Sequence, residues 1–84
     1  MNLKNSFTEY TEDEFLELIK AIENAKTESE RDHLLEHFIT VTEHPAGSDL
    51  LYYPEPDADD SPKGILQTVK EWRAAHNLPG IKSI

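Results

Sequence analysis

The sequence predicts an all-α protein with four helices, of which the third is very short. Two observations lead to this prediction: apolar residues recur at helical spacing in three separate stretches, and a residue typical of helix N-caps precedes each of them. The β-branched residues fall inside these helical patterns, so no strand is predicted. A chain of 84 residues has room for one domain, residues 1–84, with a thin core.

The first helix is predicted over residues 12–24. Thr11 and Glu14 can form a capping box, in which each side chain accepts a hydrogen bond from the backbone N–H of the other residue. Tyr10 precedes this cap and is placed to pack on Phe15 as a hydrophobic staple. The predicted core positions of this helix are Phe15, Leu18, Ile19 and Ile22.

The second helix begins after Thr27, which with Glu30 forms a second capping box, and it ends near His44 because the following proline disfavours a helical residue before it. Its predicted core positions are Leu34, Phe38 and Val41. Leu35 and Ile39 form a second apolar pair one helical turn apart, on a neighbouring face between acidic residues. This pair indicates either an interface or a wide core stripe.

The third and fourth helices are marked by proline and serine. Ser48 can cap a single-turn helix over residues 49–53, and the acidic stretch 54–60 after it reads as a loop. Ser61 is a good N-cap for the fourth helix, and Pro62 occupies the first helical position, where its missing N–H has no cost. The apolar stripe of the fourth helix, interpreted as core packing, is Ile65, Leu66, Val69 and Trp72.

The chain is strongly acidic, with 8 basic against 17 acidic residues and a formal net charge of −9. Residues 28–60 contain ten acidic residues and a single basic one, Arg31, whereas the basic residues gather in 62–84. Such a charge repels phosphate, so we expect no nucleic acid and no membrane as partner, and it attracts a basic protein. We expect a cytoplasmic protein, because neither an apolar signal core nor a run of about 18 apolar residues is present.

One motif suggests metal chemistry. His33-Leu34-Leu35-Glu36-His37 matches the H-x-x-E-H pattern of inverted zinc proteases, in which two histidines one helical turn apart share a metal and the glutamate acts as base. A catalytic zinc also needs a third protein ligand and a substrate cleft, which a domain of this size rarely provides. We therefore interpret His33 and His37 as surface histidines, leave adventitious metal binding open, and expect no catalytic residue, metal or cofactor.

The stretch from Ser48 to Pro54, SDLLYYP, is the clearest candidate for a binding site. Tyr52 and Tyr53 are adjacent on a one-turn helix, where neighbouring side chains are splayed by about 100°. At least one ring should therefore be exposed, next to acidic residues, which is typical of a binding hot spot. In the alternative interpretation, both rings cover the thin core.

Longer motifs make a family resemblance specific. The sequence resembles the immunity proteins of the DNase-type colicins and S-type pyocins. The matching stretches are LKNS, YTEDEFLELI, HF-x-x-x-TEHP-x-GSDLLYYP, DDSPKGI and VKEWRAA, which together extend from Leu3 to Ala75.

The resemblance implies a small distorted antiparallel four-helix bundle that binds and inhibits the C-terminal nuclease domain of a cognate bacteriocin and so protects the producing cell. It implies an H-N-H DNase as partner, exosite binding beside the active site, exclusion of DNA by bulk and negative charge, and no enzymatic activity. The chain is then expected to be a monomer when unbound, located in the cytoplasm, with release in complex with the toxin as a further option.

The resemblance also assigns residues. The shared short-helix motif maps to Ser48, Asp49, Tyr52, Tyr53 and Pro54. The variable specificity element in the second helix maps to Glu28, Arg31, Asp32, Leu35, Glu36 and Ile39. The sequence departs from the family by a shorter loop before the second helix, by the positive charge of Arg31 on a face meant for a basic partner, and by Ile39 where relatives often have an acid. These departures leave the cognate toxin open.

Two functions of other classes are the alternatives. The first is a small acidic helical adaptor or regulator that binds an unrelated basic protein. The second is a metal-dependent hydrolase built on the HLLEH motif.

Overall fold

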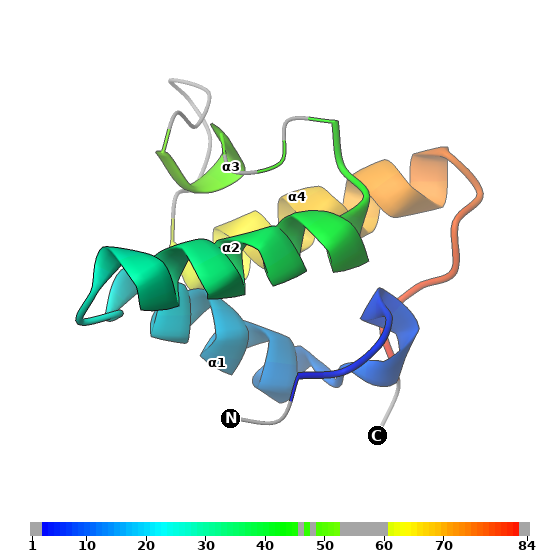
Figure 1. Ribbon diagram of the computed structural model, residues 1–84. Helices are drawn as coiled ribbons and strands as arrows, with labels where there is room; N and C mark the ends of the chain where they lie inside the picture. The colour runs from blue at the N-terminus through cyan, green and yellow to red at the C-terminus, as the bar shows by residue number, and fades with distance from the viewer. Residues whose placement is uncertain (1–2, 46, 48, 53–60, 83–84) are drawn as a thin grey trace.

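Helix α1 begins and ends as its capping residues predict. The computed structural model describes residues 3–45, 47, 49–52 and 61–82, and within them α1 spans Glu12–Glu23 (Figure 1). The Thr11 hydroxyl accepts from the Glu14 N–H at 3.2 Å, and the Glu14 carboxylate accepts from the Thr11 N–H at 3.0 Å. The capping box is therefore complete. The predicted staple is present too, because the rings of Tyr10 and Phe15 lie 5.6 Å apart, edge to face.

Helix α2 spans Glu28–Thr42 and has half of its predicted capping box. The Thr27 hydroxyl accepts from the Glu30 N–H at 3.1 Å, but the Glu30 carboxylate accepts from the N–H of Lys26, at 3.3 Å. The helix ends at Thr42, two residues before the predicted His44, because the left-handed backbone of the C-cap residue Glu43 (φ 60°) stops it.

The remaining elements are a 3₁₀ turn and two helices. The 3₁₀ turn η1 spans Phe7–Glu9, α3 spans Asp49–Tyr52, and α4 spans Pro62–Ala75. Ser61 caps α4 as predicted, since its hydroxyl accepts from the Gly64 N–H at 3.2 Å. The expected cap of the third helix at position 48, its final residue at 53 and the acidic loop at 54–60 lie outside the described residues.

The elements build an all-helical fold, with no strand in the part of the chain that the structure describes. Helix α1 packs against both α2 and α4. In the view of Figure 1, α1 lies below α2 and α3 lies above it. The C-terminal segment returns to the N-terminal one, where the Lys82 N–H donates to the Tyr10 carbonyl at 2.9 Å. None of the helices in the described residues has the length and apolar character needed to cross a bilayer.

The core confirms the predicted apolar stripes with one exception. The buried apolar side chains are Phe7, Tyr10, Phe15, Leu18, Ile19, Ile22, Leu34, Phe38, Val41, Ile65, Leu66 and Val69. Every predicted core position is among them apart from Trp72. Two of the largest rings, Phe7 and Phe15, meet edge to face with centroids 5.1 Å apart.

Helix α4 turns a different residue into the core than the one predicted. Trp72 is half-buried and lies between two imidazoles, with ring centroids 4.9 Å from His44 and 4.3 Å from His76. Its neighbour Arg73 is buried, with 4% of its surface exposed. The core position predicted for Trp72 is therefore wrong, because the buried face of α4 continues from Val69 to the residue four positions on instead of three.

Candidate protein interface

The predicted specificity residues of α2 differ in how far they are exposed to solvent. The carboxylates of Glu28, Asp32 and Glu36 are exposed, whereas Arg31 and Leu35 are half-buried. Helix α2 therefore presents acidic groups to solvent from Glu28 to Glu36. Carboxylates in this position can meet a basic surface without first breaking an intramolecular ion pair, because both ion pairs in the described residues are made by other side chains.

The second apolar pair of α2 divides between core and surface. Leu35 packs against the edge of the core, as a wide core stripe predicts. Ile39 is 39% exposed, and among the described residues it is the large apolar side chain that stands out at the surface. A single exposed apolar side chain is ordinary on a protein surface, so Ile39 bears on an interface only together with the charged residues of the same helix.

Gly47 brings the segment after α2 against Ile39. Its backbone is left-handed (φ 51°), and a Cβ added to it would lie 3.4 Å from Ile39 Cγ1. A larger residue would be strained there and would also press on this side chain. The glycine therefore lets the chain pass close to Ile39 on its way into α3.

Helix α3 is held by its apolar residues and exposes its acidic one. Leu50 and Leu51 pack against the core, and Asp49 is exposed. Tyr52 is the last residue of the helix. Ser48, Tyr53 and Pro54, which the sequence assigns to the same motif, lie outside the described residues. Since Arg31 and Leu51 line one hollow and Gly47 has room for no more than an ordinary contact with Ile39, α2 and α3 are adjacent on the surface.

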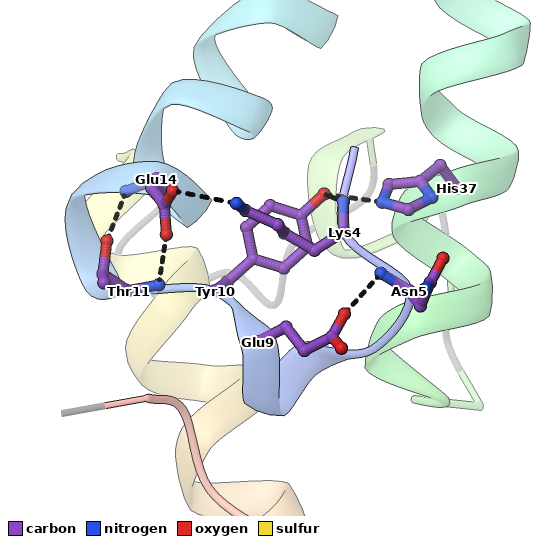
Figure 2. Close-up of polar contacts among 7 residues, drawn as sticks. All are labelled: Lys4, Asn5, Glu9, Tyr10, Thr11, Glu14 and His37. Atoms are coloured by element: carbon purple, nitrogen blue, oxygen red, sulfur yellow. Dashed lines mark hydrogen bonds and ion pairs between the residues drawn. The ribbon is translucent and has the colours of Figure 1, made fainter. Parts of the chain in front are cut away.

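A polar cluster joins the N-terminal segment to the inner side of α2 (Figure 2). The Tyr10 hydroxyl accepts from the Lys4 N–H at 3.1 Å and lies 2.6 Å from His37 Nε2. The backbone N–H occupies one side of the hydroxyl oxygen, so this arrangement favours a Tyr10 O–H that donates to an unprotonated Nε2. Burial raises the pKa of Tyr10. Burial is also the main cause that lowers the pKa of His37, and the nearby His33 lowers it further.

The same cluster fixes the start of α1. The Glu14 carboxylate, already held by the Thr11 N–H, lies 3.5 Å from the Lys4 ammonium. The hydrogen bond from the Thr11 backbone is the largest cause that lowers the pKa of Glu14. Asn5 donates its N–H to Glu9 at 2.8 Å. These contacts tie residues 4–14 into one unit that rests on α2 through the Tyr10–His37 bond.

One of the two histidines in the HLLEH motif has a structural role. His33 and Glu36 are exposed, but His37 is half-buried and bound to Tyr10. The interpretation of both histidines as surface residues is therefore wrong for His37, since the aromatic cluster around Tyr10 covers it. No group of three side chains able to hold a metal ion occurs among the described residues.

Comparison with known proteins identifies the family. The family described as colicin immunity protein / pyocin immunity protein matches residues 7–75, which is most of the chain. The chain belongs to this family. Two curated immunity proteins of Pseudomonas aeruginosa are similar over nearly their whole length. The pyocin-S2 immunity protein is 48% identical and the pyocin-S1 immunity protein 46% identical, each over 96% of this chain and 99% of the relative.

Solved structures of immunity proteins have the same fold. The chain matches one in the crystal structure of the pyocin AP41 DNase–immunity complex with a TM-score of 0.85 and 41% identity, over 96% of this chain and 100% of the other. It matches one in the structure of the mutant nuclease domain of pyocin S8 with its cognate immunity protein with a TM-score of 0.86 and 40% identity, over 95% and 100%. The resemblance inferred from the sequence is thereby confirmed.

Proposed function

We propose that this chain is an immunity protein that binds and inhibits the nuclease domain of a cognate pyocin- or colicin-type bacteriocin, and is not itself an enzyme. The observation that carries the proposal is the full-length match to immunity proteins whose solved structures are complexes with a DNase or nuclease domain. At 40–41% identity over the whole chain, an interface on the same elements is the natural expectation.

The geometry supports α2 and α3 as the docking surface. Helix α2 exposes the carboxylates of Glu28, Asp32 and Glu36 together with Ile39, and α3 exposes Asp49. Apolar contact at the centre with charges around it is the usual anatomy of a protein–protein interface. We propose that α2 carries specificity, through Glu28, Arg31, Asp32, Leu35, Glu36 and Ile39. The shared contacts are assigned to Ser48, Asp49, Tyr52, Tyr53 and Pro54.

The mechanism we propose is exosite inhibition of an H-N-H DNase. The immunity protein docks beside the active site, leaves the catalytic residues uncovered, and keeps DNA away by its bulk and by its net charge of −9. The whole chain is one domain, arranged as an antiparallel four-helix bundle. It acts in the cytoplasm of the producing cell, where the toxin is made.

Inhibition and metal access together test this proposal. The nuclease domain of the bacteriocin encoded beside this chain should lose plasmid cleavage at a 1:1 ratio of the two proteins. The same nuclease should still bind a divalent metal ion in the complex, as measured by calorimetry, because an exosite inhibitor leaves the catalytic residues accessible. Uninhibited cleavage would refute the function, and loss of metal binding in the complex would refute the exosite mechanism.

A further inference from the structure

A hollow of about 400 Å³ lies where the end of α1, the first half of α2 and α3 meet. Among the described residues, its lining is formed by Ile22 and Glu23 from α1, Arg31 from α2 and Leu51 from α3. Ile22 is 1% exposed and Leu51 packs against the core, so these two residues form an apolar floor. Glu23 and Arg31 place opposite charges beside it. The volume is sufficient for one side chain of a docked protein.

The charge of Arg31 is not compensated within the described residues. The ion pairs there are Lys4 with Glu14 and Lys70 with Glu12, and the Arg31 guanidinium makes neither an ion pair nor a hydrogen bond with the described part of the chain. Arg31 is already half-buried, and a partner on α2 would remove more of its water. A desolvated charge is costly unless it is paired, so the bound state needs an acceptor at this position.

Arg31 is also opposed by the field of the whole molecule. It is the single basic residue among ten acidic ones in residues 28–60, on a surface that attracts a basic protein. A positive charge at that place weakens general attraction, and it favours binding only through a specific local partner. We propose that the hollow receives a carboxylate side chain of the nuclease domain, which pairs with Arg31. This inference rests on the proposed function.

A carboxylate pairs with Arg31 better than other side chains do, although Glu23 on the same hollow opposes its entry. The planar guanidinium of Arg31 can hold both oxygens of a carboxylate at once. The apolar floor of Ile22 and Leu51 can contact the methylene groups of the same side chain. A lysine or arginine in the hollow would bring a like charge next to Arg31, and an apolar side chain would desolvate the guanidinium without pairing it.

The pairing with a carboxylate and the overall net charge predict opposite effects of removing Arg31, so binding measurements distinguish them. Binding to the nuclease domain of the bacteriocin encoded beside this chain is measured by calorimetry for Arg31→Ala, Glu23→Gln and the control Lys63→Ala. Lys63 is exposed at the start of α4, beside a different hollow, and its removal changes the net charge by the same amount. Because the partner is basic, Lys63→Ala should bind as well as wild type or slightly better.

We expect Arg31→Ala to weaken binding at least about tenfold, against the change in net charge, and Glu23→Gln to bind as tightly as wild type or more tightly. Arg31→Ala that binds like Lys63→Ala, or Glu23→Gln that binds clearly more weakly, overturns the inference. Urea unfolding of Arg31→Ala should match wild type, because the side chain makes no polar contact with the described residues.

Charge reversal identifies the partner residue. Arg31→Glu should lose affinity, and one Asp→Arg or Glu→Arg substitution on the docking surface of the nuclease should restore it. If no such substitution restores binding, no carboxylate occupies the hollow and the inference is wrong. If the wild-type chain does not bind the nuclease at all, the proposed function and this inference are both wrong. If the wild-type chain binds and Arg31→Ala binds equally well, only the inference is wrong.

Discussion

Arg73 shows how one buried cation can hold several segments of a small domain together. Its Nη1 donates to the carbonyls of Val41 and Thr42, at 3.3 and 3.0 Å, and its Nε donates to the Pro79 carbonyl at 3.0 Å. The guanidinium also lies 4.7 Å from the centre of the Phe7 ring. It therefore satisfies carbonyls at the end of α2 and fastens the C-terminal segment after α4.

Removing this side chain should destabilise the fold. Arg73→Met keeps the apolar stem but leaves three carbonyls without their donor, so we expect the free energy of unfolding to fall by about 3 kcal/mol or more. Urea unfolding measures the difference. Arg73→Lys is the matched control, because it keeps the charge but cannot donate to carbonyls on both sides. Its free energy of unfolding should lie between those of wild type and Arg73→Met. A loss below about 1 kcal/mol for Arg73→Met would contradict this account.

His37 makes stability depend on pH. Burial, and next His33, lower its pKa from the usual 6.5, so the unfolded chain binds a proton more readily than the folded one. The stabilisation is therefore present above pH 6.5 and is lost as pH falls below that value. Protonation would also take from the Tyr10 hydroxyl the acceptor that it uses at Nε2.

The variant His37→Gln should separate this effect from other titrations. Unfolding measured between pH 8 and pH 5 should show a smaller loss of stability for His37→Gln than for wild type. His44, whose pKa is also lowered by burial and by His76, remains in both proteins, so its effect cancels in the comparison. His33→Gln is the control on the same helix face and should keep most of the wild-type slope, since burial is the larger cause. Equal slopes for wild type and His37→Gln would show that the Tyr10 contact does not matter.

At the scale of elements, α2 is expected to decide which toxin is bound. Its outer side chains mix charge with apolar surface, and such mixtures discriminate by repulsion as well as by attraction. Exchanging Arg31, Asp32, Leu35, Glu36 and Ile39 for the residues of the pyocin-S2 immunity protein should shift protection toward pyocin S2, measured by survival of cells that carry the variant. If an exchange of the α3 motif alone shifts protection, the division of labour between the two helices is wrong.

Helix α3 is expected to supply shared affinity. A four-residue helix gains little from its own hydrogen bonds, and Leu50 and Leu51 hold it against the core, so it can present its polar residues at a fixed angle. Tyr53→Ala, at the position that follows Tyr52 in the sequence, should weaken nuclease binding by at least about 2 kcal/mol, which is roughly thirtyfold in affinity. Calorimetry measures the affinity, and urea unfolding checks the fold. A folded variant with wild-type affinity would show that the motif has been misread.

The whole molecule contributes its charge. With a net charge of −9 and exposed carboxylates on α2, the chain should attract a basic nuclease over distances at which salt screens strongly. We expect the association rate to fall at least about tenfold between low and high salt, measured by stopped flow. Lys63→Glu, far from α2 in sequence, should raise the rate at low salt slightly. A rate that does not depend on salt would remove electrostatic steering from the mechanism.

The sequence by itself determined where α1, α2 and α4 begin, where α1 and α2 end to within about two residues, and which family the chain belongs to. Thr11 and Ser61 cap their helices through residues three positions away, and Glu43 ends α2 just before the predicted His44, because caps and proline act over a few residues. Periodicity likewise identified the apolar core. The family follows from long motifs such as the one at residues 48–54, whatever their structure.

Only the tertiary structure decided which side chains meet across helices. Tyr10 and His37 are 27 positions apart, and Arg73 reaches the end of α2 from α4 while the adjacent Trp72 turns aside. The hollow beside Arg31 likewise combines residues of α1, α2 and α3. These contacts depend on the angles and offsets at which the helices pack. A shift of the buried face by one side-chain position leaves the apolar periodicity of the sequence unchanged. For that reason periodicity predicts a buried stripe but not its edge, where the proposed interface residues Arg31 and Leu35 lie.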